Sequence, residues 1–204
     1  MSEAPAATPC DDCAAGCCRE VHVVLSPREA VAMARALRVE LLAIVELRLR
    51  ERAEGAFRFR TSGDPADPRR WRVELRKVAS ADGGRRCAFL LELGTQGRCG
   101  IYAHRPVECR LYPTVLDGEA VGLRRHLPYC PPRSWSLGLI DVPLHALLHR
   151  REVDQRQADR AVEEEWNARL ERDWLSGASR APATERDLCE FLSARHGAGD
   201  QKST

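Results

Sequence analysis

Apolar residues recur with helical spacing in two stretches near the start of the chain. Residues 26–37 begin with Ser26 at an N-cap position and Pro27 in the first turn, which is a typical start of a helix. The same spacing continues from residue 39 to residue 53 through a series of leucine and valine positions. The pattern therefore predicts a helix in each stretch.

The last third of the chain also has a helical pattern. One face carries four apolar side chains in steps of four residues, with charge on the other faces: Val162, Trp166, Leu170 and Trp174. The run Glu163–Glu165 points around this helix and is expected to be solvated. A final short helix is predicted over 183–197, starting at Thr184 with Asp187 three residues later.

Between these helical regions, alternating or short apolar runs predict strands, hairpins and loops. The expected elements are a strand at 21–25, a loop at 61–70, a strand at 71–79, a hairpin at 87–102 around a glycine-containing turn, a short helical turn between prolines at 105–113, a hairpin at 114–125 with Asp117-Gly118 as its turn, and a break in regular structure at 128–132.

Composition and charge exclude few classes of function. Hydrophobic residues make up 44% of the chain and charged residues 30%, and 32 basic residues nearly balance 30 acidic ones. Only Lys77 and Lys202 among the basic residues are lysines. Arginine codons of a GC-rich genome explain this bias more simply than phosphate or RNA binding. Aromatic content of 5% is low for a surface that stacks nucleobases, so nucleic-acid binding is the least favoured function.

Two observations point to a cytoplasmic protein. The segment MSEAPAATPC lacks the basic start and apolar stretch of a signal peptide. No apolar run approaches the roughly 18 residues that a membrane-spanning helix needs. In the cytoplasm thiols stay reduced, and the odd count of 9 cysteines also argues against a disulfide framework.

The cysteines carry the candidate chemistry. Cys10 and Cys13 have the C-x2-C spacing that lets two thiolates from one turn reach the same ion. The adjacent pair Cys17 and Cys18 more naturally serves two sites or one polynuclear cluster, because neighbouring side chains in an extended segment point to opposite sides. Cys189 differs, since it lies on the apolar face of a predicted helix and is expected to pack as a small hydrophobe.

The cysteine thiols could either bind a metal or include a catalytic nucleophile. Three arginines adjoin cysteines, at positions 19, 98 and 110, and Arg105 lies four residues before Cys109, which suits an anionic thiolate centre. Alternatively, Arg19 or Arg110 could lower the pKa of a single catalytic cysteine. Metal binding is the simpler account of so many loop cysteines. Thiolate ligation suits zinc and iron–sulfur clusters equally.

Four sequence blocks carry a resemblance to a known family: CDDCAAGCCR, CAFLL, GRCGIYAHRPVECRLYP and YCP. They lie within residues 10–19 and 87–132, and there the chain resembles the YkgJ-type cysteine-cluster family, whose domain is described as zinc- or iron-chelating. The family spacing is often C-x2-C-x2-C-C. Here three residues separate Cys13 from Cys17, so the individual roles of Cys17 and Cys18 stay open.

The resemblance implies a set of eight metal ligands: Cys10, Cys13, Cys17, Cys18, Cys87, Cys99, Cys109 and Cys130. It also implies that Arg105 and Pro106 fix the turn that presents Cys109, and that Tyr102 and Tyr112 pack over the site. The family resembles, in part, flagellin lysine methylases with an iron–sulfur centre. An iron–sulfur-dependent modifying enzyme is therefore the alternative function.

Histidines are weaker candidates. His145 and His149 are one helical turn apart and could bind metal, but they lack the glutamate of zinc proteases, so a packing or surface role is expected. His104 and His126 lie near the cysteine turns and could replace a thiolate.

Together these patterns predict an α+β fold, in which a small metal-centred domain with cysteine-bearing loops and short hairpins precedes a helical extension. The expected segments are a disordered start at 1–9, the metal-binding domain at 10–135 with a variable insert at about 38–86, the helical extension at 136–197 and a disordered tail at 198–204. The expected function is to hold iron, as an iron–sulfur cluster, or zinc. Iron is slightly favoured because adjacent cysteines and surplus thiolates suit a polynuclear centre. No membrane partner is expected.

Overall fold

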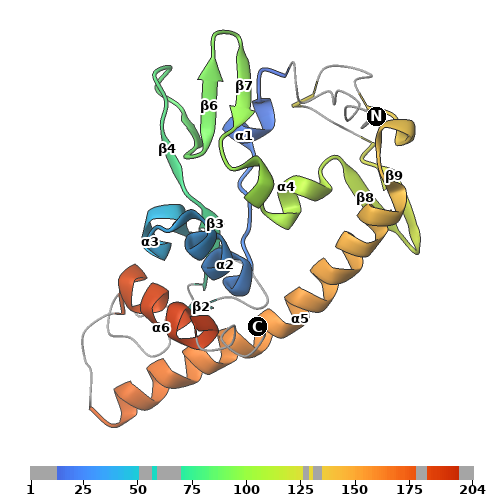
Figure 1. Ribbon diagram of the computed structural model, residues 1–204. Coiled ribbons are helices and arrows are strands. Elements are labelled where there is room, and N and C mark those ends of the chain that lie inside the picture. Colours follow the sequence, from blue (N-terminus) through green and yellow to red (C-terminus); the bar gives the residue numbers. More distant parts are fainter. Residues whose placement is uncertain are drawn as a thin grey trace. The chain divides into compact units, whose positions relative to one another are not determined.

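A computed structural model describes residues 13–50, 57–58, 70–125, 129–130, 135–177 and 183–197 (Figure 1). Helices and small antiparallel sheets occur together in these residues, which confirms the predicted α+β class. The chain forms two compact units: unit 1 is Met1–Val23 with Lys77–Val153, and unit 2 is Val24–Arg76 with Asp154–Thr204. The domain boundaries expected from the sequence stay a prediction.

Unit 1 is built from short elements. Its described helices and 3-10 turns are α1 (Gly16–Glu20), η1 (Tyr102–His104), α4 (Val107–Leu111) and η2 (Leu137–Leu139). Its described strands are β4 (Lys77–Ala79), β5 (Arg85–Cys87), β6 (Leu90–Leu93), β7 (Gln96–Cys99), β8 (Thr114–Asp117) and β9 (Ala120–Leu123). They pair only as the antiparallel couples β4–β5, β6–β7 and β8–β9 among the described residues.

The two hairpins predicted from glycine-containing turns are confirmed. The β6–β7 turn has Gly94 at φ 65°, and the β8–β9 turn has Gly118 at φ 61°, a left-handed conformation that glycine adopts without steric cost. The second turn lies one residue later than expected, because Asp117 still pairs with Ala120 and the loop is Gly118-Glu119. The short helical turn expected at 105–113 is α4.

A buried threonine ties β8 to the following helix in unit 1. The Thr114 hydroxyl donates to the Leu111 carbonyl at 2.6 Å, and its oxygen lies 3.0 Å from His145 Nδ1 and 3.0 Å from His149 Nε2. Since the hydroxyl has a single proton, both ring nitrogens act as donors here. The HALLH motif therefore serves packing in unit 1.

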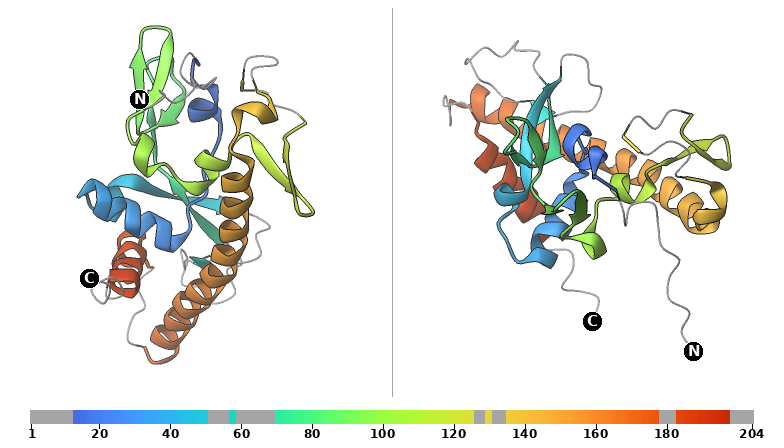
Figure 2. Two further views of the ribbon diagram at one scale, coloured as in Figure 1. Left: turned by 45° about the vertical axis from the view of Figure 1, so that its right-hand side comes forward. Right: turned by 90° about the horizontal axis from the view of Figure 1, so that it is seen from above.

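The helix α5 covers Val142–Leu175, and its residues up to Val153 belong to unit 1 while those from Asp154 belong to unit 2; Figure 2 draws the chain from two further directions. Along the described residues, no helix combines the length and apolar character that crossing a membrane requires.

Unit 2 combines a small sheet with helices. Its described elements are α2 (Pro27–Leu37), α3 (Leu41–Ile44), β1 (Val45–Arg50), β2 (Phe57–Arg58), β3 (Arg70–Leu75), the second part of α5 and α6 (Glu185–Gly197). The strand order is β1-β3-β2, and both pairings are antiparallel. Trp166 of α5 is 1% exposed, and the centre of its ring lies 5.3 Å from the centre of the Phe191 ring. Its indole N–H donates a hydrogen bond to the Arg58 carbonyl at 3.0 Å. The apolar face predicted for this helix is thus a packing face.

Both predicted helix starts in unit 2 are confirmed. The Ser26 hydroxyl accepts a hydrogen bond from the Glu29 N–H at 3.1 Å at the start of α2. Before α6, the Thr184 N–H donates to the Asp187 carboxylate at 2.7 Å, and the Asp187 N–H donates back to the Thr184 hydroxyl at 3.2 Å. These reciprocal bonds satisfy N–H groups that a helix terminus leaves open.

Two expected elements of unit 2 were wrong. The helix over 39–53 is only the four-residue α3, after which the chain continues as β1. Leucines at positions 47 and 49 alternate with charged residues, so this stretch also fits a strand, and pairing with β3 decides in favour of the strand. The strand expected at 21–25 is reduced to one isolated bridge between Val24 and Glu74. The strand expected at 71–79 is confirmed as β3 and β4, interrupted at Arg76.

Several expected segments lie outside the described residues: 1–9, most of 61–70, most of 128–132 and 198–204.

The run Glu163–Glu165 of α5 is described, and its burial differs from the expected solvated face. Glu164 and Glu165 are exposed, but Glu163 is partly buried one turn after the buried Asp159. Burial, followed by the charge of Asp159, raises the pKa of Glu163 to about 7.

Replacing Glu163 should remove a pH dependence of stability. Between the carboxyl pKa of the unfolded chain, about 4, and the raised value in the fold, the folded state binds more protons, so its free energy of unfolding falls as pH rises. We expect Glu163→Gln to exceed the wild type at pH 8 by about 1 kcal/mol, after allowance for partial solvent screening, and to match it at pH 4. Urea denaturation at both pH values measures this. Glu164→Gln is the matched control and should change neither value; an equal effect of Glu163→Gln at both pH values would contradict the expectation.

Candidate metal centre

The first cysteine loop of unit 1 is anchored on the β6–β7 hairpin. The Gly97 N–H donates to the Cys13 carbonyl at 2.9 Å. Ala15 has the left-handed φ of 57°, and its N–H lies 3.3 Å from the Cys13 sulfur, which accepts this hydrogen bond. The left-handed residue turns the chain directly into α1, which carries Cys17 and Cys18.

The adjacent thiols of α1 interact with each other. A hydrogen bond from the Cys18 thiol, helped by backbone N–H groups and the charge of Arg105, lowers the pKa of Cys17 to about 7 against the effect of burial. The same hydrogen bond, followed by burial and the charges of Cys17, Cys87 and Cys109, raises the pKa of Cys18 far above its ordinary value. One sulfur of the pair therefore becomes a thiolate much more easily than the other.

Three more cysteines converge on this pair from other elements. Cys87 ends β5, Cys99 ends β7, and Cys109 lies within α4. Burial is the main cause that raises the pKa of each of these thiols, and the charge of Cys17 raises all three further. We call the five interacting side chains the thiol cluster: Cys17, Cys18, Cys87, Cys99 and Cys109.

The sulfurs are close but not tightly clustered. Among the described residues, no three cysteine sulfurs lie all within 4.8 Å of one another. The eight described cysteines all have free thiols.

Cations stand beside the thiol cluster. Burial raises the pKa of Cys99, and the guanidinium charge of Arg105 counteracts this rise. The Arg105 guanidinium stacks on the Tyr102 ring at 3.7 Å from its centre, while its Nε is buried without a hydrogen-bond partner in the described structure. A buried cationic donor next to several thiols suits an anionic thiolate–metal centre, so the residues present fit such a group.

Lys77 is a site residue that sequence reasoning missed. It is 6% exposed, lies opposite Cys87 in the β4–β5 pairing, and its ammonium group donates to the Arg19 carbonyl of α1. A rare lysine in a strand that faces a cysteine is the signal that could have found it. Arg19, in contrast, forms an ion pair with Glu92, so its guanidinium is already engaged by a carboxylate.

Cys130 interacts with a tyrosine. Its thiol donates to the Tyr112 hydroxyl at 3.4 Å. Burial, followed by the hydrogen bond to Cys130 and the charges of Cys130 and Cys17, raises the pKa of Tyr112. The charge of Cys17 thus reaches the same ring that contacts Cys130.

The remaining cysteine and histidine candidates are not part of the thiol cluster as the structure describes it. Cys10 and His126 lie outside the described residues. His104 is exposed. Cys189, 7% exposed in α6 of unit 2, packs as the small hydrophobe that its sequence context predicts.

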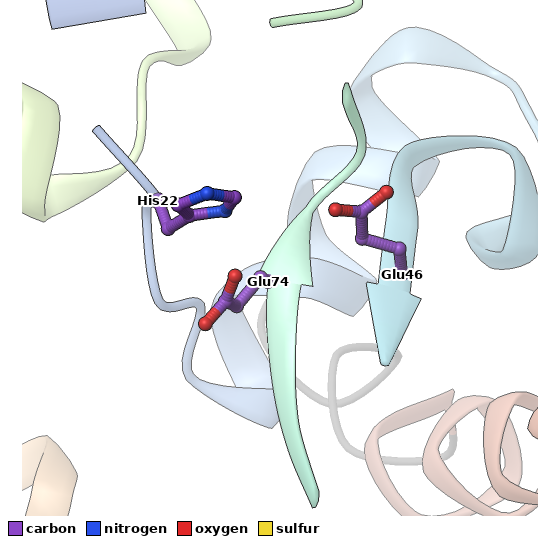
Figure 3. A group of neighbouring side chains, drawn as sticks. All are labelled: His22, Glu46 and Glu74. Carbon is purple, nitrogen blue, oxygen red and sulfur yellow. The ribbon is translucent and has the colours of Figure 1, made fainter. Parts of the chain in front are cut away.

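A carboxylate pair was not singled out by the sequence. Glu46 of β1 and Glu74 of β3 are directly opposed in the sheet of unit 2, and Figure 3 shows them on these neighbouring strands. Glu74 is fully buried. His22, also drawn there, belongs to unit 1. Because both carboxylates belong to unit 2, the pair is not counted with the thiol centre of unit 1.

Comparison with models of known protein families gives a match. Residues 9–131 match the model of the CxxCxxCC family, which carries the description "Putative zinc- or iron-chelating domain". Neither the curated proteins nor the solved structures contain a match to this chain.

The contact between Gly97 and the cysteine loop can be tested by adding one methyl group. A Cβ at position 97 would lie 2.4 Å from the Ala15 Cβ and 2.9 Å from Leu90 Cδ1. We expect Gly97→Ala to push the hairpin away from α1, to lower the free energy of unfolding by about 1–3 kcal/mol and to weaken metal retention.

Thermal unfolding and metal analysis of the purified variant measure both effects. Gly122→Ala in β9 is the matched control, because a Cβ there meets nothing within 4 Å. Equal unfolding temperatures and equal metal contents of the two variants would show that neither stability nor metal retention needs the close approach at Gly97.

Proposed function

We propose that this chain, which belongs to the CxxCxxCC family of zinc- or iron-chelating domains, holds an iron–sulfur cluster through cysteine thiolates. The proposed ligands come from the set Cys10, Cys13, Cys17, Cys18, Cys87, Cys99, Cys109 and Cys130. The observation that carries the proposal is the thiol cluster, in which segments far apart in the chain bring five thiols into electrostatic contact. We place the metal-binding domain at residues 10–135 and the protein in the cytoplasm, where the thiols stay reduced.

The spacing of the sulfurs supports a cluster over a single zinc ion. A tetrahedral zinc site with Zn–S bonds of about 2.3 Å holds its sulfurs roughly 3.8 Å apart. Among the described cysteines, no three sulfurs approach that arrangement, since none of the possible trios lies within 4.8 Å. A polynuclear cluster binds its thiolates through different iron atoms and so accepts a wider spacing. Zinc is the alternative metal.

Charge supports the same conclusion. The hydrogen bond to Cys17, followed by burial, raises the pKa of Cys18, and burial followed by neighbouring thiolate charges raises the pKa values of Cys87, Cys99 and Cys109. These thiols therefore keep their protons unless a cation replaces them. A bound centre would supply that cation, and Arg105 and Lys77 would offset the remaining negative charge. The cluster, when bound, supplies electron-transfer chemistry.

A catalytic role is the second proposal. A single cluster uses four thiolates, whereas the proposed set has eight members, so several thiols are left for a second ion or for a reaction. This surplus favours a modifying enzyme of the kind implied by the resemblance to flagellin lysine methylases. Labelling of the metal-loaded protein with a thiol reagent tests the surplus, because the spare cysteines should react while the ligands are protected.

Anaerobic purification tests the metal assignment. We expect brown protein with broad absorbance near ~400 nm and with stoichiometric iron and inorganic sulfide. Cys99→Ala should lose most of the bound iron. Cys189→Ala is the matched control and should keep it, because this cysteine packs in α6 of unit 2. A colourless protein with bound zinc would contradict the cluster, and retention of iron by Cys99→Ala would contradict the proposed ligand.

Metal removal tests the role of the centre in stability. A structural metal can contribute ~10–16 kcal/mol of folding free energy, whereas whole domains retain about 5–15 kcal/mol. We expect metal-free protein to lose its cooperative transition in unit 1. Hydrogen exchange read peptide by peptide should show lost protection in β6–β7 and retained protection in α2 and α6. Unchanged exchange in β6–β7 after chelation would exclude a stabilising role for the metal.

A further inference from the structure

Tyr112 has a fixed position beside the thiol centre of unit 1. It directly follows α4, the helix that carries Cys109, and its N–H donates to the Glu108 carbonyl at 3.2 Å. Its side chain is partly buried, and the Arg124 guanidinium lies 5.8 Å from the centre of its ring. The tyrosine ring is therefore carried by the same short helix as one of the proposed ligands.

The hydroxyl of this ring meets a second proposed ligand. The Cys130 thiol donates to the Tyr112 oxygen at 3.4 Å, a distance that suits a hydrogen bond involving sulfur. A tyrosine hydroxyl is both a donor and an acceptor, so the phenol also has a proton that it can donate. The contact therefore involves two protons, one on the Cys130 sulfur and one on the Tyr112 oxygen. Each of the two atoms can also accept a hydrogen bond.

We infer that Tyr112 is a positioning residue that holds Cys130 as a metal ligand by donating its hydroxyl proton to the thiolate. This inference rests on the proposed function. With a metal bound, Cys130 would be a thiolate whose proton has passed to solvent, so its sulfur would be an acceptor only. The Tyr112 hydroxyl would then rotate and donate to this sulfur, and the contact would persist with its direction reversed. A hydrogen bond to a charged ligand both orients it and stabilises its charge.

Tyr112→Phe tests this role in the full chain, because it removes the hydroxyl and keeps the ring. The apparent dissociation constant for Zn²⁺ is measured by competition with a chelator, and the thiolate-to-metal absorption is recorded after loading with Co²⁺. Loss of a hydrogen-bond partner of a metal ligand typically weakens binding 10–100-fold. We expect a change of that size in Tyr112→Phe, together with a shifted Co²⁺–thiolate band, while hydrogen-exchange protection of β6–β7 at saturating Zn²⁺ equals that of the wild type.

Two further variants separate this role from a general packing effect. Ser176→Ala is the control for loss of a hydroxyl, because the Ser176 hydroxyl donates to the Asp173 carbonyl at 3.2 Å in unit 2; its Zn²⁺ affinity should equal that of the wild type. In a Cys130→Ala background, the effect of Tyr112→Phe should vanish, since the hydroxyl then has no sulfur to hold.

The outcomes distinguish the inference from the proposed function. Wild-type affinity in Tyr112→Phe, or an undiminished effect of this substitution in the Cys130→Ala background, overturns the role of Tyr112 and leaves metal binding intact. A wild-type chain that takes up neither Zn²⁺ nor iron overturns both. Zinc binding without a cluster overturns the iron–sulfur proposal and leaves the role of Tyr112 standing if the tenfold or larger loss is observed.

Discussion

The cost of burying several thiols next to one another is the constraint on which unit 1 depends. Burial opposes ionisation of each sulfur of the thiol cluster, and the charge of Cys17 makes ionisation of the other four harder. Protonated thiols could pack there as small apolar groups, but so many of them in polar loops form a poor core. A bound cation favours the thiolates over the protonated thiols, because it stabilises all the thiolates together. The cluster is thus an arrangement whose favourable state includes a metal.

The backbone of unit 1 is shaped to bring these sulfurs together. Hairpins end at cysteines, so Cys87 and Cys99 stand at strand ends where the chain turns. Pro106, fully buried, directly precedes α4, the helix that carries Cys109. Gly97 allows the cysteine loop to lie directly on the hairpin. The surrounding charges have divided roles, since Arg105 acts on the sulfurs while Arg19 is held by Glu92.

Local interactions made part of this fold predictable. The starts of α2 and α6 depend on hydrogen bonds between residues three apart, and the hairpin turns depend on single glycines, so the sequence reveals them directly. The stretch after α3 was misread because its leucines fit both a helix and a strand. Pairing with β3, a distant segment, decided the matter. Glu163 was misread because a helical period shows which residues share a face but not what covers it.

The sequence by itself determined the chemistry: thiolates in glycine- and proline-rich turns, with a lone helical cysteine set apart as a packing residue. Only the tertiary structure decided which thiols meet. It joined Cys17 and Cys18 to three sulfurs from other elements, gave Cys130 a tyrosine partner and brought Lys77 opposite Cys87. The reason is physical. Ligand chemistry belongs to a side chain and is visible in its type and spacing, whereas proximity between distant segments arises from strand pairing and packing that no short stretch of sequence contains.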